Sequence, residues 1–253
     1  MDIQIIYEKI KKAKELRLIN NCYNFNVVEN STKLWEAGDD FLFAYADHGI
    51  QRLIYFGSNW DAVDELLKQV KNGRYLIEFM TKRPDEHKPA GSALLARMMR
   101  LANYDCRTVF SEDSAVAQYM DLPVGEKAKV EDVNEIDRIL RSTFHTEISH
   151  LPSKDEIKSR IDQFTVHKSE GNIDALLQTN VMPKKFYINQ VVNKGDRKNI
   201  HAILLNELKK YIKDGGKYLY AWVEDTNMAS LKFHEKYGMK HDGMWSMIYC
   251  LER

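Results

Sequence analysis

The chain has 253 residues, enough for one large domain or two domains of ordinary size. Lys plus Arg and Asp plus Glu each number 37, so the formal net charge is zero, and we expect neither a nucleic-acid nor a membrane partner. The sequence contains no apolar run of transmembrane length and no signal-peptide core. Cys22, Cys106 and Cys250 lie far apart and outside metal-binding spacing, so we expect reduced thiols, a cytoplasmic protein and no metal site.

The first half of the chain combines helical and strand patterns. Helical periodicity predicts a helix over residues 3–18 and a second over 60–70, which Ser58 or Asn59 can cap and Gly73 can end. The predicted strands are 24–28, the hairpin 41–46 with 51–56, and 74–81. Residues 84–90 suit one or two helical turns. Residues 93–101 suit helix or strand, and we favour a strand because the order helix, glycine, strand recurs near the C-terminus.

The second half begins after residues 122–125 (L-P-V-G), which have the composition of a junction. Its predicted strands are 127–130, 173–179, 185–192, 218–224 and 245–251. Its predicted helices are 133–144, 155–164 with a capping box of Ser153 and Glu156, and 200–213. A last helix begins at Asn227 as N-cap and ends at Gly238. Tyr218, Tyr220 and Trp222 alternate at strand period and are expected in the core.

Residues 227–239 read N-M-A-S-L-K-F-H-E-K-Y-G-M, after a strand and the loop-to-helix segment V-V-N-K-G-D-R-K-N-I-H. This region resembles the GNAT N-acetyltransferase superfamily, whose members often read N-x-x-A-x-x-L-Y-E-K-L-G-F there. The positions that keep the pattern are Asn227, Phe233, Glu235, Lys236 and Gly238. The resemblance covers about half the chain, from about residue 124 to the end.

The resemblance implies an α/β (α+β) fold, with a mixed, mostly antiparallel GNAT-type sheet flanked by helices and a smaller N-terminal α/β half. It places the acetyltransferase-like domain at 122–253 and leaves 1–121 as a separate domain. The order of elements in 1–121 allows a reduced GNAT-like copy, which would make the chain a tandem protein. The alternative is a lid-like or dimerising appendage of other ancestry.

The implied cofactor is acetyl-CoA (coenzyme A), whose pyrophosphate the family holds with backbone N–H groups at the start of the central helix. The aligned segment 196–201 departs from the family pattern, because Asp196 replaces a cation and neither glycine is kept. Lys194, Arg197 and Lys198 supply cations instead. The loop is either a shifted, weakened cradle or a solvated basic turn. The cofactor-binding candidates are Val191, Val192, Asn193, Arg197, Lys198, Asn199, Ile200, His201, Ala202 and Asn227.

The resemblance also suggests catalytic residues. His234 stands where many members carry a Tyr and is the candidate general acid for the leaving thiolate, although a helix His can equally pack and bond locally. Asn189 and Gln190 occupy the strand where some members carry a carboxylate base, and neither can take a proton. Glu224 or a water chain is the remaining candidate base, unless Glu224 is only a solvated strand end. Asn227 caps its helix, with or without a contact to the coenzyme.

These features predict an acetyl-CoA-dependent N-acyltransferase that acts on a small-molecule or peptide amine as a monomer or homodimer. The alternative is a catalytically silent GNAT-fold module that senses a ligand or binds a partner. The incomplete loop and the missing strand carboxylate favour the alternative, whereas the retained 227–239 helix and the basic loop favour the enzyme.

Overall fold

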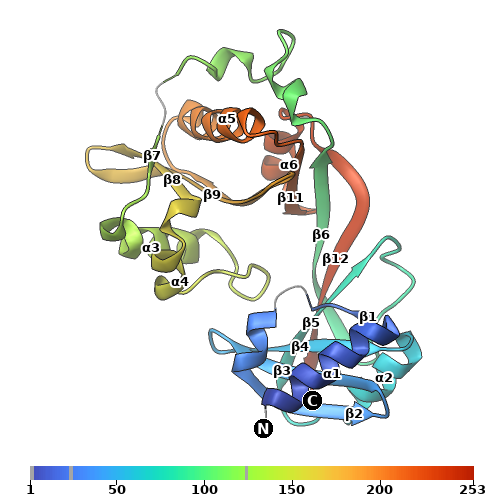
Figure 1. Cartoon of the computed structure of the whole chain (residues 1–253). Helices are drawn as coiled ribbons and strands as arrows, with labels where there is room; N and C mark the ends of the chain where they lie inside the picture. Colours follow the sequence, from blue (N-terminus) through green and yellow to red (C-terminus); the bar gives the residue numbers. More distant parts are fainter. Residues whose placement is uncertain (1–2, 23–24, 123–124) are drawn as a thin grey trace. The chain divides into compact units, whose positions relative to one another are not determined.

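The computed structural model describes residues 3–22, 25–122 and 125–253 (Figure 1). Contacts divide the chain into two compact units, unit 1 with residues 1–97 and 244–253 and unit 2 with residues 98–243. These units differ from the predicted domains 1–121 and 122–253, because two long strands, β6 (Ser92–Asn103) and β12 (Lys240–Glu252), each run through both units. The predicted junction includes Pro123 and Val124, which lie outside the described residues. The GNAT-like ancestry of 1–121 stays a prediction.

Unit 1 is a sheet with one helix on each face. Its strands follow the order β2-β3-β4-β5-β12, and β1 pairs with β4. β4 and β5 are parallel, whereas β1 with β4, β2 with β3, β3 with β4 and β5 with β12 are antiparallel. The bounds are β1 (Ile19–Asn20), β2 (Ser31–Ala37), β3 (Asp40–Asp47), β4 (Ile50–Gly57), β5 (Arg74–Thr81), α1 (Ile3–Leu16) and α2 (Trp60–Gln69). Phe41 and Phe43 of β3 pack with α1, whereas Leu42 and Ala44 pack with α2. This alternation makes both faces of β3 apolar.

Most elements predicted for unit 1 are confirmed. The first helix, the hairpin, β5 and the strand reading of 93–101 agree with the structure, and Asn59 rather than Ser58 caps α2 by accepting from the Ala62 N–H. The strand predicted at 24–28 is wrong. Phe25–Asn30 forms a 3-10 helix, Asn24 lies outside the described residues, and the strand β2 follows instead. Residues 84–90 form a turn rather than a helix, because Pro84 and Pro89 cannot donate backbone hydrogen bonds.

Unit 2 is a mixed, mostly antiparallel sheet between two pairs of helices, with the strand order β6-β11-β10-β9-β8-β7. Its parallel pair is β10 with β11. The strands are β7 (Glu126–Lys127), β8 (Phe164–Ser169), β9 (Asn172–Met182), β10 (Lys185–Asn193) and β11 (Tyr218–Glu224). The helices are α3 (Val133–Thr143), α4 (Lys154–Ser159), α5 (Arg197–Lys213) and α6 (Met228–Glu235). The predicted fold class is therefore confirmed.

Each face of the unit 2 sheet has its own apolar core. Leu204 of α5 and Leu231 of α6 pack with Ile188 and Ala221 on one face. Ile136 of α3 and Ile157 of α4 pack with Leu176 on the other. The strands alternate their side chains between these two cores, so helices cover both faces of the sheet (Figure 1). The N-terminus of α5 lies just after the end of β10 and beside the start of β9.

The predicted capping residues of the second half are confirmed, but several predicted ends of helices and strands are wrong. The Ser153–Glu156 capping box and the Asn227 cap are present, and Gly238 ends the last helix at a φ of +66°. The helix predicted to 164 ends at Ser159, since a 3-10 turn (Ile161–Gln163) and the unpredicted β8 follow. The strand predicted at 127–130 is the shorter β7. Among the described residues, no helix has the length and apolar character needed to cross a membrane.

Candidate functional site

Strands β10 and β11 are paired over only part of their length. Their parallel register runs from Lys185↔Tyr218 to Ile188↔Ala221 and ends there, although β10 continues to Asn193 and β11 to Glu224. Beyond this point β10 pairs with β9, and β11 pairs with β6. The ladder with β9 shifts between Ile188 and Gln190, so Asn189 is the extra residue of a β-bulge. The facing backbone edges of 190–193 and 222–224 therefore have no strand between them and can pair with an extended ligand.

The start of α5 lies next in sequence to this opening. Asp196 is its N-cap, and its Oδ1 accepts from the Lys198 N–H at 2.9 Å, while its carbonyl accepts from the Asn199 N–H at 3.0 Å. The N–H groups of Lys194 and Gly195 donate to the carbonyl of Asp174 at 2.7 and 3.1 Å. Several N–H groups of the predicted cradle are thus already bonded. Asp196, which was predicted only as a departure from the family's cation, is therefore the N-cap of the helix.

A polar cluster holds this loop against the β8–β9 hairpin. His167 Nδ1 lies 2.6 Å from Asp174 Oδ1, and Asn199 Nδ2 donates to Asp174 Oδ2 at 3.2 Å. A Cβ on Gly195 would lie 2.6 Å from Asp174 Oδ2, so the close approach requires glycine. No sequence pattern pointed to His167 and Asp174, because β8 was not predicted and Asn199, the third member of the cluster, lies 25 residues beyond Asp174. The Asn199 side chain is engaged here, which differs from its predicted role toward the coenzyme.

The cations of the loop remain at the surface. Arg197, Lys198 and Lys194 are exposed, and Lys198 Nζ lies 3.9 Å from Asp196 Oδ2. The positive end of the α5 dipole adds to their field. An anion at this helix start would meet the exposed cations first. The predicted residues Val191 and Asn193 are half-buried and Val192 is buried on the adjoining part of β10.

His201 is a core residue. Its side chain is 3% exposed, and its ring stacks on Tyr119 with the centroids 4.4 Å apart. Nδ1 lies 2.8 Å from the Tyr237 hydroxyl. Burial, with a smaller contribution from the Lys236 charge, lowers the pKa of His201 from 6.5 to about 4. The predicted neighbours Ile200 and Ala202 are buried as well, so the side chains of all three lie in the core.

His234 of α6 is also buried, with 3% of its side chain exposed. Its Nδ1–H donates to the Ser230 carbonyl at 2.7 Å, since a carbonyl can only accept. Nε2 therefore carries the lone pair, and this atom is buried without a hydrogen-bond partner among the described residues. Burial lowers the pKa of His234 to about 4. In this tautomer Nε2 can accept a proton or a hydrogen bond but has none to give.

The other predicted catalytic residue, Glu224, is half-buried at the end of β11, and its carbonyl accepts from the Asn227 N–H at 2.9 Å. Asn227 caps α6 through its Oδ1, which accepts from the Ser230 N–H at 3.0 Å. On β10, Asn189 is exposed and Gln190 half-buried. Both catalytic candidates thus sit on the segment that follows the opening, from the end of β11 into α6.

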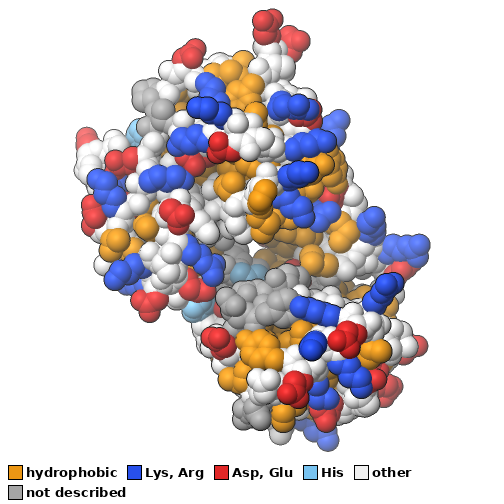
Figure 2. Space-filling view, in the orientation of Figure 1, with side chains coloured by type: hydrophobic (Ala, Val, Ile, Leu, Met, Phe, Trp, Pro, Cys, Tyr) orange, Lys and Arg blue, Asp and Glu red, His pale blue; other side chains and the backbone are white. Residues whose placement is uncertain are grey.

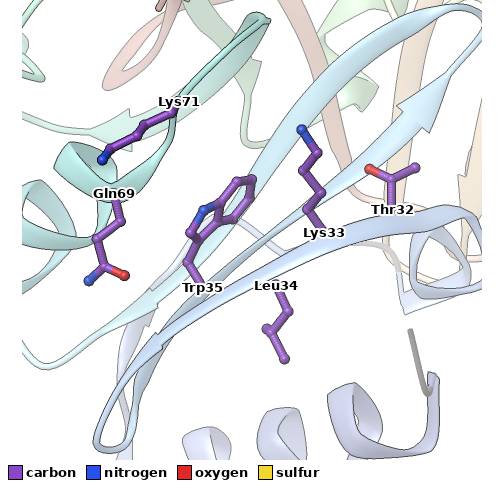
Figure 3. A pocket seen from close by; sticks show the side chains of 6 residues that line it. All are labelled: Thr32, Lys33, Leu34, Trp35, Gln69 and Lys71. Carbon is purple, nitrogen blue, oxygen red and sulfur yellow. The ribbon is translucent and has the colours of Figure 1, made fainter.

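Unit 1 has a shallow pocket of its own, about 470 Å³ in volume (Figure 3). Its lining is Thr32, Lys33, Leu34 and Trp35 from β2, with Gln69 and Lys71 from the end of α2. Figure 3 shows the two lysines near the Trp35 ring, and Lys33 Nζ donates to the Tyr75 hydroxyl at 2.9 Å. This lining suits a small anion better than a cation. On the molecule's visible face as a whole, basic and acidic side chains lie interspersed (Figure 2).

No protein-family model matches the sequence, and no curated protein matches it significantly. Solved structures do match. A GNAT-family protein from Novosphingobium aromaticivorans has 13% identity and a TM-score of 0.51, over 89% of this chain and 92% of that chain.

Two further structures are similar over most of the chain. A tandem GNAT protein from the clavulanic acid biosynthesis pathway has 11% identity and a TM-score of 0.57, over 86% of this chain and 81% of that chain. A Drosophila protein has 14% identity and a TM-score of 0.55, over 96% of this chain and 86% of that chain. Identities this low show a shared fold and nothing finer. With the order of elements and the partly paired β10 and β11, they establish that this chain has the fold of the GNAT superfamily.

Proposed function

We propose that the protein is an N-acyltransferase that moves an acetyl group from acetyl-CoA to an amine. The partial pairing of β10 and β11 beside the start of α5 carries this proposal. A coenzyme A molecule combines an extended arm containing two amides with a pyrophosphate. Unpaired strand edges suit the first group, and a helix N-terminus with exposed cations suits the second. The GNAT fold supports the same assignment.

The residues present fit such a ligand, with one shift from the sequence expectation. Among the candidates at the start of α5, Arg197 and Lys198 are exposed, whereas the side chains of 200–202 are buried. We therefore assign Arg197 and Lys198 to the phosphates. The backbone of Val191, Val192 and Asn193 would hold the amide arm, since that edge of β10 faces away from β9. When bound, the coenzyme supplies an acetyl group activated as a thioester.

Glu224 and His234 are the two candidates for proton transfer in this reaction. Under the proposal Glu224, at the end of β11, accepts the proton that the amine loses, directly or through water. The general-acid role of His234 stays a prediction, and two observations count against it. Ser230 fixes the proton on Nδ1, and a pKa of about 4 leaves the ring neutral at pH 7. A neutral His234 can still orient the thiol or a hydroxyl as an acceptor through Nε2.

Calorimetry with acetyl-CoA and a thiol-release assay with a panel of amines test the proposal. Ligand at a hundred times its dissociation constant should stabilise the protein by about 2.7 kcal/mol. Titrations with pantetheine alone and with ADP alone separate the strand edge from the helix start. The proposal fails if acetyl-CoA and coenzyme A do not bind at millimolar concentration. Binding without thiol release from any amine would favour the catalytically silent module.

His234 is tested by kinetics. If it is the acid, His234→Ala lowers kcat by about 100-fold or more at a nearly constant KM for acetyl-CoA. His234→Asn keeps a donor for the Ser230 carbonyl and has no titrating group. If His234 only packs and bonds to Ser230, the Asn variant retains most of the turnover while the Ala variant loses stability. An Asn variant as inactive as the Ala variant would show that Nε2 is needed. Partial recovery of the rate in His234→Tyr, with the alkaline limb of the pH profile shifted upward, would then restore the acid role.

A further inference from the structure

One face of the unit 2 sheet carries aromatic side chains in place of the polar residues usual on a partly solvated sheet. Leu219, Ala221 and Val223 of β11 pack into the core under α5 and α6. Because strand residues alternate, Tyr218, Tyr220 and Trp222 face the opposite way. Tyr220 is buried, whereas Tyr218 and Trp222 are half-buried, so the core position expected for these residues holds only for Tyr220.

Neighbouring rings extend this set into a continuous surface. Tyr187 of β10 stacks on Tyr220 with the centroids 5.2 Å apart. Tyr104, just beyond β6, lies edge-on to Tyr218 and Tyr220 at 6.1 and 6.2 Å, and 55% of its surface is exposed. We call the five residues Tyr104, Tyr187, Tyr218, Tyr220 and Trp222 the aromatic face. Large rings left partly in water at a contiguous site mark a binding surface.

A salt bridge holds the aromatic face in shape. The Arg100 guanidinium lies 5.4 Å from the Tyr220 ring and 5.9 Å from the Trp222 ring. It bonds to Asp242, with Nε at 2.8 Å and an Nη at 2.7 Å from one carboxylate oxygen, and the Tyr104 hydroxyl donates to the same oxygen at 3.0 Å. The Asp242 side chain is only 4% exposed. These bonds hold the rings in place before a ligand binds. Because the charges of Arg100 and Asp242 cancel, the centre of the aromatic face carries no net charge.

The end of this face beside the open strand edges is rich in hydrogen-bond acceptors. Gln178 of β9 and Gln190 of β10 are register partners, and Gln178 is 5% exposed. Gln178 alternates with Leu177, which packs under α5, so it shares the side of the sheet with the aromatic face. The Oε1 atoms of both glutamines are buried without a hydrogen-bond partner among the described residues. Buried amide oxygens in this state favour a ligand that brings N–H donors.

We propose that the aromatic face is the acceptor subsite and that the acceptor is a primary amine carrying an aromatic ring. This rests on the proposed N-acyltransferase function. The ring lies against the half-buried rings of Tyr187 and Trp222, which Tyr220 supports from beneath, and the amine points to the glutamine pair. The unpartnered amide oxygens of Gln178 and Gln190 favour an ammonium group over an anion.

With the acceptor bound in this way, Glu224 lies at the end of the aromatic face where the amine reacts. By strand alternation its side chain shares the face with Trp222, two residues earlier. In the reaction the amine nitrogen forms a bond to the acetyl carbonyl carbon, and the carbon–sulfur bond breaks. The bound ammonium first loses one proton to Glu224 or water, which frees the lone pair for attack. The nitrogen loses its second proton to solvent, and the thiolate takes one proton from solvent, so one proton is released overall. Atoms and charge then balance without a further reactant.

Calorimetry on the full chain without coenzyme tests the subsite directly. The probes are 2-phenylethylamine, 2-cyclohexylethylamine, which lacks the aromatic ring, and 3-phenylpropionate, which lacks the amine. We expect 2-phenylethylamine to bind at least 10-fold more tightly than either of the others. Equal affinity for the phenyl and cyclohexyl amines would overturn the aromatic class, and tighter binding of the carboxylate would overturn the amine class.

Variants locate the binding. Tyr187→Leu and Trp222→Leu replace half-buried rings, so the fold should survive, and each should weaken 2-phenylethylamine at least 10-fold while acetyl-CoA binding stays unchanged. Tyr7→Leu, an exposed ring on α1, is the matched control and should change nothing. Unchanged amine affinity in both face variants would refute the subsite. The amine titrations contain no coenzyme, so they test the subsite alone. If acetyl-CoA does not bind in its own titration, the proposed function is refuted and the subsite is not.

Discussion

Two buried histidines of unit 2 should make the protein sensitive to mild acid. His201 and His234 each have a pKa lowered from 6.5 to about 4 by burial. Between these values the unfolded chain binds a proton that the folded chain does not, so stability falls as pH falls; above 6.5 and below 4 the contribution is flat. Each pKa difference corresponds to about 3 kcal/mol in total. Between pH 7 and pH 5 each histidine should contribute a loss of about 2 kcal/mol, or about 4 kcal/mol together.

Urea unfolding at several pH values measures this loss, and variants assign it. His201→Asn and His234→Asn keep a hydrogen-bonding group near the former Nδ1 and cannot titrate. Each should reduce the pH 7 to pH 5 loss by about 2 kcal/mol, whatever it costs at pH 7. His145→Asn, at an exposed histidine on the same unit, is the control and should leave the pH dependence intact. An unchanged slope in the double variant would show that carboxylates, rather than these histidines, govern acid unfolding.

Three further predictions concern the loop, a helix end and the units. The double variant Arg197→Glu with Lys198→Glu should weaken the binding of coenzyme A by about 2 kcal/mol or more in calorimetry. Lys213→Glu, at the far end of α5, should leave this binding unchanged. Equal effects of the two would mean that the loop cations do not contact phosphate. Gly238→Ala should cost about 1–2 kcal/mol in urea unfolding, because its φ of +66° disfavours a Cβ, and no cost would mean that the backbone relaxes. The fragment 122–253 lacks β6 and should show no cooperative thermal transition, and a sharp one would support the sequence-based boundary.

The features that the sequence predicted well depend on neighbours within one turn. Asn59, Ser153 and Asn227 each accept from a backbone N–H three residues ahead, and these hydrogen bonds are all present. Such contacts need no knowledge of the rest of the fold. Likewise, β3 and β4 could be predicted because both faces of these strands are buried, which makes each a continuous apolar run between turn residues.

The features that were missed depend on contacts between distant residues. β2 lies at the edge of its sheet and is mostly exposed, so it lacks the apolar period that marks a strand. Arg100 and Asp242 are 142 residues apart, and nothing local marks them as partners. His201 was predicted in the first turn of the helix, beside the coenzyme, because the start of α5 was placed three residues late. With the helix beginning at Arg197, its ring falls inside the aromatic core.

The start of α5 shows why a loop without the usual glycines can still receive an anion. The two carboxylates that appear to oppose one, Asp174 and Asp196, are already engaged, the first by His167 and Asn199 and the second by the N–H groups of the helix. The exposed cations and the positive helix end then set the local field. Exposed charges are screened over about 8 Å at physiological salt, whereas hydrogen bonds to a strand edge are not. Raising salt should therefore weaken ADP more than pantetheine, and equal salt dependence would mean that both parts of the coenzyme bind away from this loop.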